Sequence, residues 1–288
     1  MYDTIGFHLI SKNSQDCLKH LSRGKEEIDR ETGLILCKGK LENLTVKVNS
    51  ENISIFGSLP KFYLGSNLQQ LTRKDTEKAI EKLSDLLYLP IDESRTYRLD
   101  VGANLIVDEP LQNYYSCLGI LPRFKRSEIA NKQTLLYTTS KRAQEYYDKG
   151  RDAIRTKTII PEPLKNQRVM RIETHLTRKV AEAFKLQELR AKDLYNENIY
   201  MQSIDLWQKY YFSIQRIKKL RFNKEALEMV NAKMLEKQLA LIGLKTIGEM
   251  EISQMIESSK GDIDKMQLSR LRKKLKEIAQ QPELTEPN

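Results

Sequence analysis

The sequence of 288 residues contains little cysteine, glycine or proline, and it has one tryptophan. The cysteines, Cys17, Cys37 and Cys117, are odd in number and lack CxxC spacing, which argues against a disulfide framework and a zinc knuckle. Twelve glycines and eight prolines exclude collagen-like and low-complexity classes. With 40% hydrophobic residues, the chain is expected to be globular, with one large domain or two modest ones.

Long apolar runs are also absent. No segment approaches the roughly 18 apolar residues of a membrane span, and the first residues carry no basic n-region. We therefore expect a soluble, unprocessed protein without a membrane partner. The scarcity of cysteine fits a reducing cytoplasm best.

Positive charge is concentrated in the middle of the chain. The whole sequence has 49 Lys and Arg against 39 Asp and Glu, a net charge of +10. Residues 121–179 hold 15 basic and 6 acidic side chains, whereas residues 1–120 hold 15 and 17. Such a block attracts phosphate polyanions and makes their binding salt-dependent. The alternative is a solvated basic face.

The pattern of strands and helices predicts an α+β fold with an antiparallel-rich central sheet and flanking helices. Short β-type runs cover 34–37, 44–48 and 53–56. We place this α+β domain at residues 1–178 and a helical domain, for DNA binding or oligomerisation, at 179–288. The helices expected in the second domain cover 179–195, 198–216, 224–242, 246–258 and 263–280.

A helix is also expected after residue 72. Thr72 is a suitable N-cap, and Asp75 falls in the first turn. Ile80, Leu83 and Leu87 follow at helical spacing and predict one buried stripe, which ends before Pro90.

The segment 57–67 has two glycines, a lysine and two aromatic residues, and we expect a loop. Glycine allows backbone amides to approach a phosphate, and Phe62 or Tyr63 can stack on a base. An ordinary connection with a buried aromatic residue is the alternative.

Two later strands each place an Arg-x-acid pair on one face. Period-two alternation puts Arg98 with Asp100, and Arg171 with Glu173 and His175. If the strands are close in one sheet, the two carboxylates converge on a divalent metal. Oxygen ligands suit Mg²⁺ or Mn²⁺, and the imidazole favours Mn²⁺. The alternative is cross-strand pairing of Asp100 with Arg171 and of Glu173 with Arg98.

Adjacent tyrosines, Tyr146 and Tyr147, follow a predicted strand at 134–137 inside the basic block. A phenol has a pKa of about 10, so it needs a cation, a metal or a base to act as a nucleophile. Tyrosine is also a common half-buried strand residue. Neighbouring strand residues face opposite ways, so only one of the two can reach a metal on the sheet.

The last predicted helix carries an apolar stripe surrounded by basic residues. The stripe consists of Ile263, Met266, Leu271, Leu275 and Ile278. The basic residues are Arg270, Arg272, Lys273, Lys274 and Lys276. This face binds DNA or forms a solvated helix rim.

Six short segments follow one another between residues 3 and 180. They are Gly57–Phe62 through Gly65–Asn67, Leu71–Arg73, Arg98–Asp100, Thr134–Tyr137, Tyr147–Lys149 and Arg171–Glu173. In this order they resemble the phage and plasmid replication initiation proteins of the filamentous-phage gene II/X family. The helical end resembles the variable C-terminal part of that family more loosely.

The resemblance implies a rolling-circle replication initiator. Such a protein is a metal-dependent endonuclease that nicks one strand at a phage or plasmid origin and later rejoins it. A tyrosine stays joined to the 5′-phosphate, and the free 3′-hydroxyl serves a host polymerase. The implied partners are origin DNA and the host replication helicase and polymerase, in the cytoplasm of a bacterial host. A homodimer is left open.

The resemblance also implies roles for single residues. Asp100 and Glu173, with His175, are the expected ligands of Mg²⁺ or Mn²⁺. Tyr147 is the expected nucleophile, because Asp148 and Lys149 complete the family-like triplet; Tyr146 stays the alternative, and Lys149 is counted among the catalytic residues. The expected DNA-binding residues are Lys61, Arg98, Arg142, Arg151 and Arg171.

One feature departs from many other replication nickases. These use a His-hydrophobic-His metal motif, but His8, His20 and His175 are not spaced in this way. A carboxylate-based site is therefore required. Two other functions stay open: a non-catalytic origin-binding protein, in which the Arg-x-acid pairs are only charge pairs, and a metal-dependent nuclease that hydrolyses with water.

Overall fold

The computed structural model describes residues 1–28, 35–131, 133–158, 160–217, 247–258 and 264–280, together with positions 236, 240, 241, 243 and 244. The chain divides into two compact units, Met1–Lys219 and Leu220–Asn288. The boundary predicted after residue 178 is therefore too early. The first unit extends farther because Val180, Phe184 and Ile199 belong to its hydrophobic core.

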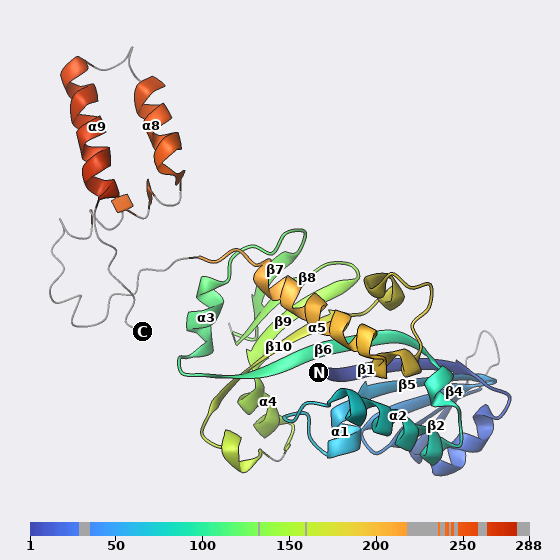
Figure 1. Ribbon diagram of the computed structural model, residues 1–288. Coiled ribbons are helices and arrows are strands. Elements are labelled where there is room, and N and C mark those ends of the chain that lie inside the picture. The colour runs from blue at the N-terminus through green and yellow to red at the C-terminus, as the bar shows by residue number, and fades with distance from the viewer. Residues whose placement is uncertain are drawn as a thin grey trace. The chain divides into compact units, whose positions relative to one another are not determined.

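An antiparallel sheet forms the body of the first unit, with ten strands in the described part of the chain (Figure 1). The strands are β1 (Tyr2–Ile10), β2 (Ser22–Ile28), β3 (Ile35–Leu41), β4 (Leu44–Asn49), β5 (Asn52–Ser58), β6 (Arg95–Val107), β7 (Lys125–Ile129), β8 (Thr134–Thr138), β9 (Arg142–Asp148) and β10 (Arg168–Leu176). Their spatial order is β2-β3-β4-β5-β1-β6-β10-β9-β8-β7. The predicted α+β fold is confirmed.

Helices and 3₁₀ turns connect the strands. The α-helices of the first unit are α1 (Leu59–Leu64), α2 (Arg73–Leu87), α3 (Leu111–Cys117), α4 (Lys149–Arg155) and α5 (Glu197–Phe212). The 3₁₀ helices are η1 (Ser14–His20), η2 (Ile91–Glu93), η3 (Glu162–Leu164), η4 (Val180–Phe184) and η5 (Ala191–Tyr195). Among the described helices, none combines the length and the apolar character that a membrane crossing requires.

Helix α2 begins as its sequence predicts. The Thr72 side chain accepts a hydrogen bond from the Asp75 amide at 3.1 Å, and the Asp75 carboxylate accepts one from the Thr72 amide at 3.0 Å. This reciprocal capping satisfies two backbone donors of the first turn. Ile80, Leu83 and Leu87 are buried, so the predicted stripe is confirmed.

One face of the sheet is covered and the other is polar. The core on the covered face joins strand residues to side chains of α1, α2 and α5, and α5 runs across β6 in Figure 1. On β1 and β5 the alternate residues, such as His8 and Ser54, are half-buried, and they pair with each other. Gly6 pairs with Arg98 on the same polar face, which is the face of the candidate site.

The loop predicted at 57–67 contains helix α1 instead. Ser58 accepts a hydrogen bond from the Lys61 amide at the N-terminus, and Gly65, with a φ of 76°, ends the helix in the left-handed conformation. Phe62 is 1% exposed and packs in the core, so the prediction that it stacks on a base is wrong. Lys61 is half-buried on this helix.

The helices predicted after residue 178 are confirmed only in part. The segment 179–195 forms the 3₁₀ helices η4 and η5 in place of an α-helix, whereas α5 corresponds to the helix predicted at 198–216. The predicted helix at 224–242 lies outside the described residues except for positions 236, 240 and 241, which are helical.

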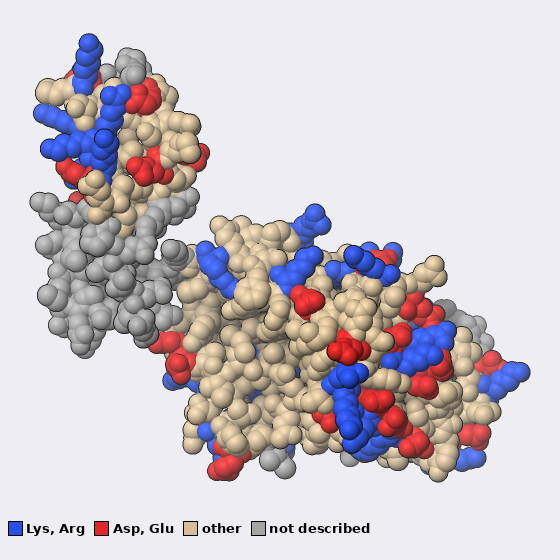
Figure 2. Space-filling view, in the orientation of Figure 1, with Lys and Arg blue, Asp and Glu red and all other residues tan. Residues whose placement is uncertain are grey.

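The second unit contains α8 (Glu249–Ser258) and α9 (Lys265–Ala279). Of the predicted apolar stripe, Ile263 lies outside the described residues, and Met266 and Leu271 are 61% and 44% exposed. Leu268 is the buried residue of α9. Figure 2 shows Lys and Arg side chains gathered along α9, and Arg272 donates to Glu257 of α8 at 2.6 Å.

Candidate active site

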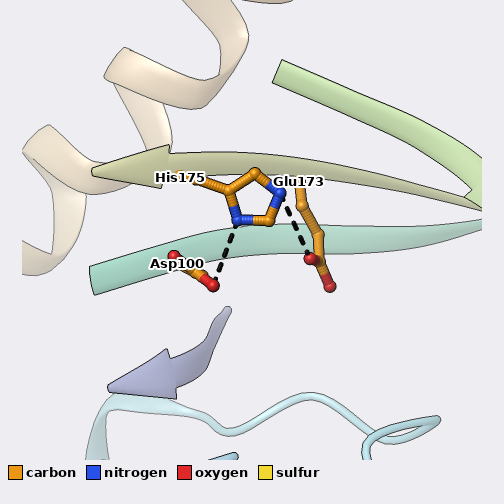
Figure 3. Close-up of side chains that lie close together, drawn as sticks. All are labelled: Asp100, Glu173 and His175. Atoms are coloured by element: carbon orange, nitrogen blue, oxygen red, sulfur yellow. Dashed lines mark ion pairs between the residues drawn. The ribbon is translucent and has the colours of Figure 1, made fainter. Parts of the chain in front are cut away.

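The two Arg-x-acid strands are neighbours in the sheet. Strands β6 and β10 pair antiparallel, with His175 opposite Asp100 and Glu173 opposite Gly102. Because side chains alternate along a strand, Asp100, Glu173 and His175 project from the same face. Figure 3 shows the three side chains converging from the two strands. The predicted juxtaposition is therefore present.

The three side chains form a compact, buried cluster. One ligand atom from each lies within 4.8 Å of the others. His175 Nδ1 is 3.1 Å from Asp100 Oδ2, and His175 Nε2 is 3.8 Å from Glu173 Oε2. Nδ1 is buried and forms no hydrogen bond with any described residue, despite its short distance to Asp100.

Gly102 makes room for this cluster. A Cβ atom at this position would lie 2.9 Å from Glu173 Cγ and 3.2 Å from Arg171 Nη2. Any larger residue would therefore displace the two side chains that cross over β6.

Each carboxylate pairs with the arginine of its own strand. Arg98 Nη2 donates to Asp100 Oδ2 at 2.9 Å, and Arg171 Nε donates to Glu173 Oε1. The alternative in which Asp100 pairs with Arg171 and Glu173 with Arg98 is therefore wrong. The i, i+2 spacing on one face explains this outcome, because it brings the partners together without help from the neighbouring strand.

Arg171 also binds Asp3, a residue that the sequence analysis did not identify. Arg171 Nη2 donates to Asp3 Oδ2 at 2.8 Å, and Nη1 donates to Asn104 Oδ1 at 3.0 Å. The Arg171 side chain is 2% exposed. The prediction that Arg171 contacts DNA is therefore wrong in this structure: the guanidinium is enclosed by its own protein partners.

The two adjacent tyrosines point to opposite faces of β9. The Tyr147 hydroxyl donates to Glu173 Oε1 at 3.1 Å. Tyr146 is fully buried in the core on the other face, 6.1 Å from the Tyr137 ring, and its hydroxyl has no partner in the described part of the chain. Of the pair, only Tyr147 lies at the cluster.

Glu145 is a second residue that the sequence analysis did not assign. It lies opposite Glu173 in the pairing of β9 with β10, and its Oε2 is 3.0 Å from His175 Nε2. The signal was present in the sequence, because Glu145 and Tyr147 share one face by period-two alternation.

Burial and neighbouring charges shift the pKa values of these groups. Burial raises the pKa of Glu173 to about 7, with Arg171 opposing the rise. Burial lowers the pKa of His175, but the carboxylates of Asp100 and Glu145 outweigh it and raise that pKa to about 10. Burial and the nearby Glu173 carboxylate raise the pKa of the Tyr147 phenol well above its ordinary value.

Lys149 is the first residue of α4 and follows Tyr147 by two residues. Its side chain is 1% exposed, and Nζ donates to Asp152 Oδ2 at 2.8 Å. The same atom is 5.6 Å from the centroid of the Tyr147 ring. Burial lowers the pKa of Lys149 despite this partner. The structure thus places a buried amine beside the Tyr147 ring.

The other predicted DNA-binding residues are distributed over the molecule. Arg98 is at the cluster, whereas Arg142 lies on the face of Tyr146 and donates to the Tyr210 hydroxyl at 2.5 Å. Arg151 is exposed on α4, in the cavity that Tyr147 and Glu145 also line.

The donor set of the cluster fits a divalent metal. Two carboxylates and an imidazole are the ligands that Mn²⁺ and Mg²⁺ accept, with the imidazole favouring Mn²⁺. His175 Nδ1 is buried and lies 3.1 Å from Asp100 Oδ2, so the imidazole and this carboxylate can offer ligand atoms to the same ion. Glu145 on the other ring nitrogen orients the imidazole, as carboxylates commonly do for metal-binding histidines.

Comparison with known proteins assigns the chain to a family. The sequence family that describes the N-terminal part of the phage gene II replication-associated proteins matches residues 1–207 of the chain. The match covers every strand of the sheet, the cluster and Tyr147, and it ends inside α5. No curated protein matches the chain. The predicted resemblance is confirmed: the chain belongs to the gene II family of phage replication-associated proteins.

Proposed function

We propose that this phage replication-associated initiator acts by nicking and rejoining one DNA strand at a phage or plasmid origin, through a tyrosine-phosphate intermediate. The observation that carries the proposal is the hydrogen bond between the Tyr147 hydroxyl and Glu173 of the carboxylate-imidazole cluster. A potential nucleophile and a potential metal site thus share one carboxylate. The family match supports the replication role.

Asp100, Glu173 and His175 are the proposed ligands of Mn²⁺ or Mg²⁺. When bound, the ion would supply a Lewis acid for the scissile phosphate. The two oxygens of Glu173 face different partners: Oε2 faces His175, whereas Oε1 accepts the Tyr147 hydroxyl. Glu173 can therefore bind the ion through Oε2 and accept the Tyr147 hydroxyl hydrogen bond through Oε1 at the same time.

Tyr147 is the proposed nucleophile. Its phenol oxygen attacks the scissile phosphorus, an O–P bond forms, and the bond from phosphorus to the 3′-oxygen breaks. The phenol proton passes to Glu173 Oε1, to which it is already hydrogen-bonded. The 3′-oxygen leaves and takes a proton from solvent. Because the 5′-phosphate stays on the tyrosine, the reverse reaction rejoins the strand without further energy input.

Positive charge near the tyrosine favours the forming phenolate. Lys149 Nζ lies 5.6 Å from the Tyr147 ring centroid, and Arg171 lies behind Glu173. Both are buried, so their fields act through a medium of low dielectric constant. We assign Lys149 the role of offsetting charge on Tyr147, whereas Arg171 positions Glu173 and Asp3.

The proposed partners are origin DNA and the host helicase and polymerase that use the nicked template. We place the reaction in the cytoplasm of the bacterial host. Of the residues suggested for DNA contact, Arg151 has the most suitable position, because it is exposed in the cavity that contains Tyr147.

The test is incubation of the full chain with its supercoiled replicon and Mn²⁺ or Mg²⁺, followed by a denaturing gel. The proposal predicts a nicked circle and a protein-DNA adduct that survives denaturation. Nicking without an adduct would indicate a hydrolytic nuclease. DNA binding with neither product would indicate a non-catalytic origin-binding protein. In that function the Arg98–Asp100 and Arg171–Glu173 ion pairs would only neutralise buried charge.

A further inference from the structure

A second cavity lies at the ends of β6 and β10, beyond the His175 side of the cluster. Its volume is about 360 Å³. Arg95, Thr96 and Tyr97 of β6 line one side, and residues 177–182 and Leu189 line the other. The segment 177–179 directly follows β10, so the cavity begins two residues after His175, roughly 7 Å along the strand.

The lining of this cavity is positively charged. Arg95, Arg178 and Lys179 face a single carboxylate, that of Glu182. Lys179 pairs with Glu182 at 2.7 Å, and Lys141 from outside the lining pairs with the same carboxylate at 3.2 Å. Arg95 and Arg178 form no ion pair with any residue that the structure describes.

The cavity beside Tyr147 has the opposite balance. Glu145, Asp148 and Asp152 line it together with Arg151 and Arg155. Arg155 is already paired with Asp152 at 2.7 Å. A phosphate without an accompanying cation therefore finds a better electrostatic environment between Arg95 and Arg178 than next to Tyr147.

Thr96 provides an independent indication of a ligand. Its side chain is 2% exposed and lines the cavity. The Thr96 amide donates a hydrogen bond to Leu189 O at 2.7 Å. The Thr96 hydroxyl oxygen has no hydrogen-bond partner in the described ranges. Burying a hydroxyl without a hydrogen-bond partner costs free energy. A bound anion could accept a hydrogen bond from this hydroxyl and remove that cost.

We propose that this cavity binds a phosphate group of the DNA backbone. Arg95 and Arg178 supply the charge, and the Thr96 hydroxyl donates a hydrogen bond to a phosphate oxygen. A strand held here is anchored just beyond the end of β10, at a site that takes no part in bond breaking. The affinity for phosphate follows from the cavity itself, whereas its assignment to DNA rests on the proposed function.

The test uses three variants of the full chain: Arg178→Gln, Thr96→Val and, as a matched control, Lys185→Gln. Lys185 is exposed at the end of η4 and does not line the cavity. Affinity for a single-stranded oligonucleotide is measured by fluorescence anisotropy over a series of salt concentrations. Arg178→Gln should weaken binding about tenfold, and its salt slope should be smaller by about one. Thr96→Val should weaken binding several-fold, and Lys185→Gln should leave the slope unchanged.

Thermal unfolding without DNA separates a ligand site from a structural role. Thr96→Val should keep or raise the melting temperature, because in the free protein the hydroxyl forms no hydrogen bond with any residue that the structure describes. A lower melting temperature would show that the hydroxyl serves the fold and would overturn its role as a donor to phosphate. Oligonucleotide affinities of Arg178→Gln and Thr96→Val that equal that of Lys185→Gln would overturn the proposal.

Inorganic phosphate is the second probe. Its binding to the wild type and to Arg178→Gln is monitored through NMR chemical-shift changes. Competition between inorganic phosphate and the oligonucleotide supports the proposal. Loss of phosphate binding in Arg178→Gln with unchanged oligonucleotide affinity would assign the cavity to a free phosphate compound and overturn its assignment to DNA. Formation of the protein-DNA adduct is measured in a separate assay. If the wild type forms the adduct but Arg178→Gln and Thr96→Val bind the oligonucleotide as tightly as the wild type, the phosphate site is contradicted and the proposed function is not.

Discussion

The Tyr147 hydroxyl donates a hydrogen bond to Glu173 Oε1 at 3.1 Å, although 26 residues separate the two in the chain. Tyr147 lies opposite Arg171 in the register of β9 and β10, which brings its ring over the carboxylate two residues along. Because burial and Glu173 both raise the pKa of the phenol, Tyr147 stays protonated in the metal-free protein. For Tyr147 to act as the proposed nucleophile, the charge around Glu173 must therefore change.

Replacement of a carboxylate of the cluster tests the metal site. Asp100→Asn and Glu173→Gln should reduce nicking by at least about 100-fold, because each removes a charged ligand. DNA binding should stay within about twofold, since neither change removes a basic residue. Mn²⁺ binding, followed by electron paramagnetic resonance, should be lost in both variants. Full nicking in the presence of a chelator would refute the metal site.

Glu145 is expected to act through His175. Glu145→Gln weakens the contact that orients the imidazole, and it should lower Mn²⁺ affinity about 10- to 100-fold without removing a ligand. The matched control is Glu162→Gln, because Glu162 is exposed and pairs only with Lys165 among the described residues. Calorimetric titration with Mn²⁺ checks both. Equal affinities of Glu145→Gln and the control would show that Glu145 does not position the ring.

Asp3 should make stability depend on pH below about 5. Burial opposes ionisation of Asp3, but Arg171 and Ser58 outweigh it and lower its pKa to about 2. A carboxyl with a lowered pKa in the folded state stabilises the fold above its unfolded pKa, and this contribution disappears as the pH falls through about 2. We expect it to amount to about 2 kcal/mol at neutral pH.

Asp3→Asn is the corresponding variant. Urea unfolding should show its deficit relative to the wild type at pH 5 to 7, and the two curves should converge toward pH 2. A deficit that stays constant over this range would mean that packing of the side chain, and not its charge, stabilises the fold.

The second unit is expected to contribute to origin recognition. Helix α9 carries several exposed basic residues, and one of them, Arg272, donates a hydrogen bond to Glu257 of α8. Removal of residues 220–288 should lower affinity for origin duplex more than it lowers cleavage of a single-stranded oligonucleotide. Gel-shift and cleavage assays on both substrates measure the two effects. Equal losses would indicate a structural role for the second unit.

Local patterns in the sequence predicted the elements that depend on neighbouring residues. The Thr72 cap, the stripe of α2 and the common face of Glu173 and His175 follow from spacing alone. Spacing could not predict that Arg171 pairs with Asp3. The two residues are 168 positions apart, and the place of Asp3 depends on the pairing of β1 with β6. Helix α1 was missed because its glycines favour a loop, whereas Gly65 in fact ends the helix.

The predicted end of the first domain, after residue 178, was wrong for a similar reason. The segment after β10 has a helical composition, but its burial against the sheet decides that it belongs to the first unit. Trp207 of α5 donates to the Ile172 carbonyl at 3.1 Å, a contact that spacing within α5 does not reveal. The choice of Tyr147 over Tyr146 is different, since alternation predicts opposite faces but not which face holds the cluster.

The most direct test of the account compares Tyr147→Phe with Tyr146→Phe in the nicking assay on a denaturing gel. Tyr147→Phe removes the oxygen that we propose as the attacking atom and one hydrogen bond, at a cost to stability of about 1 kcal/mol, so the fold should survive. Tyr146→Phe removes a hydroxyl that has no partner among the described residues. The account predicts that Tyr147→Phe yields neither nicked circle nor covalent adduct, whereas Tyr146→Phe yields both. An adduct that persists in Tyr147→Phe would contradict it.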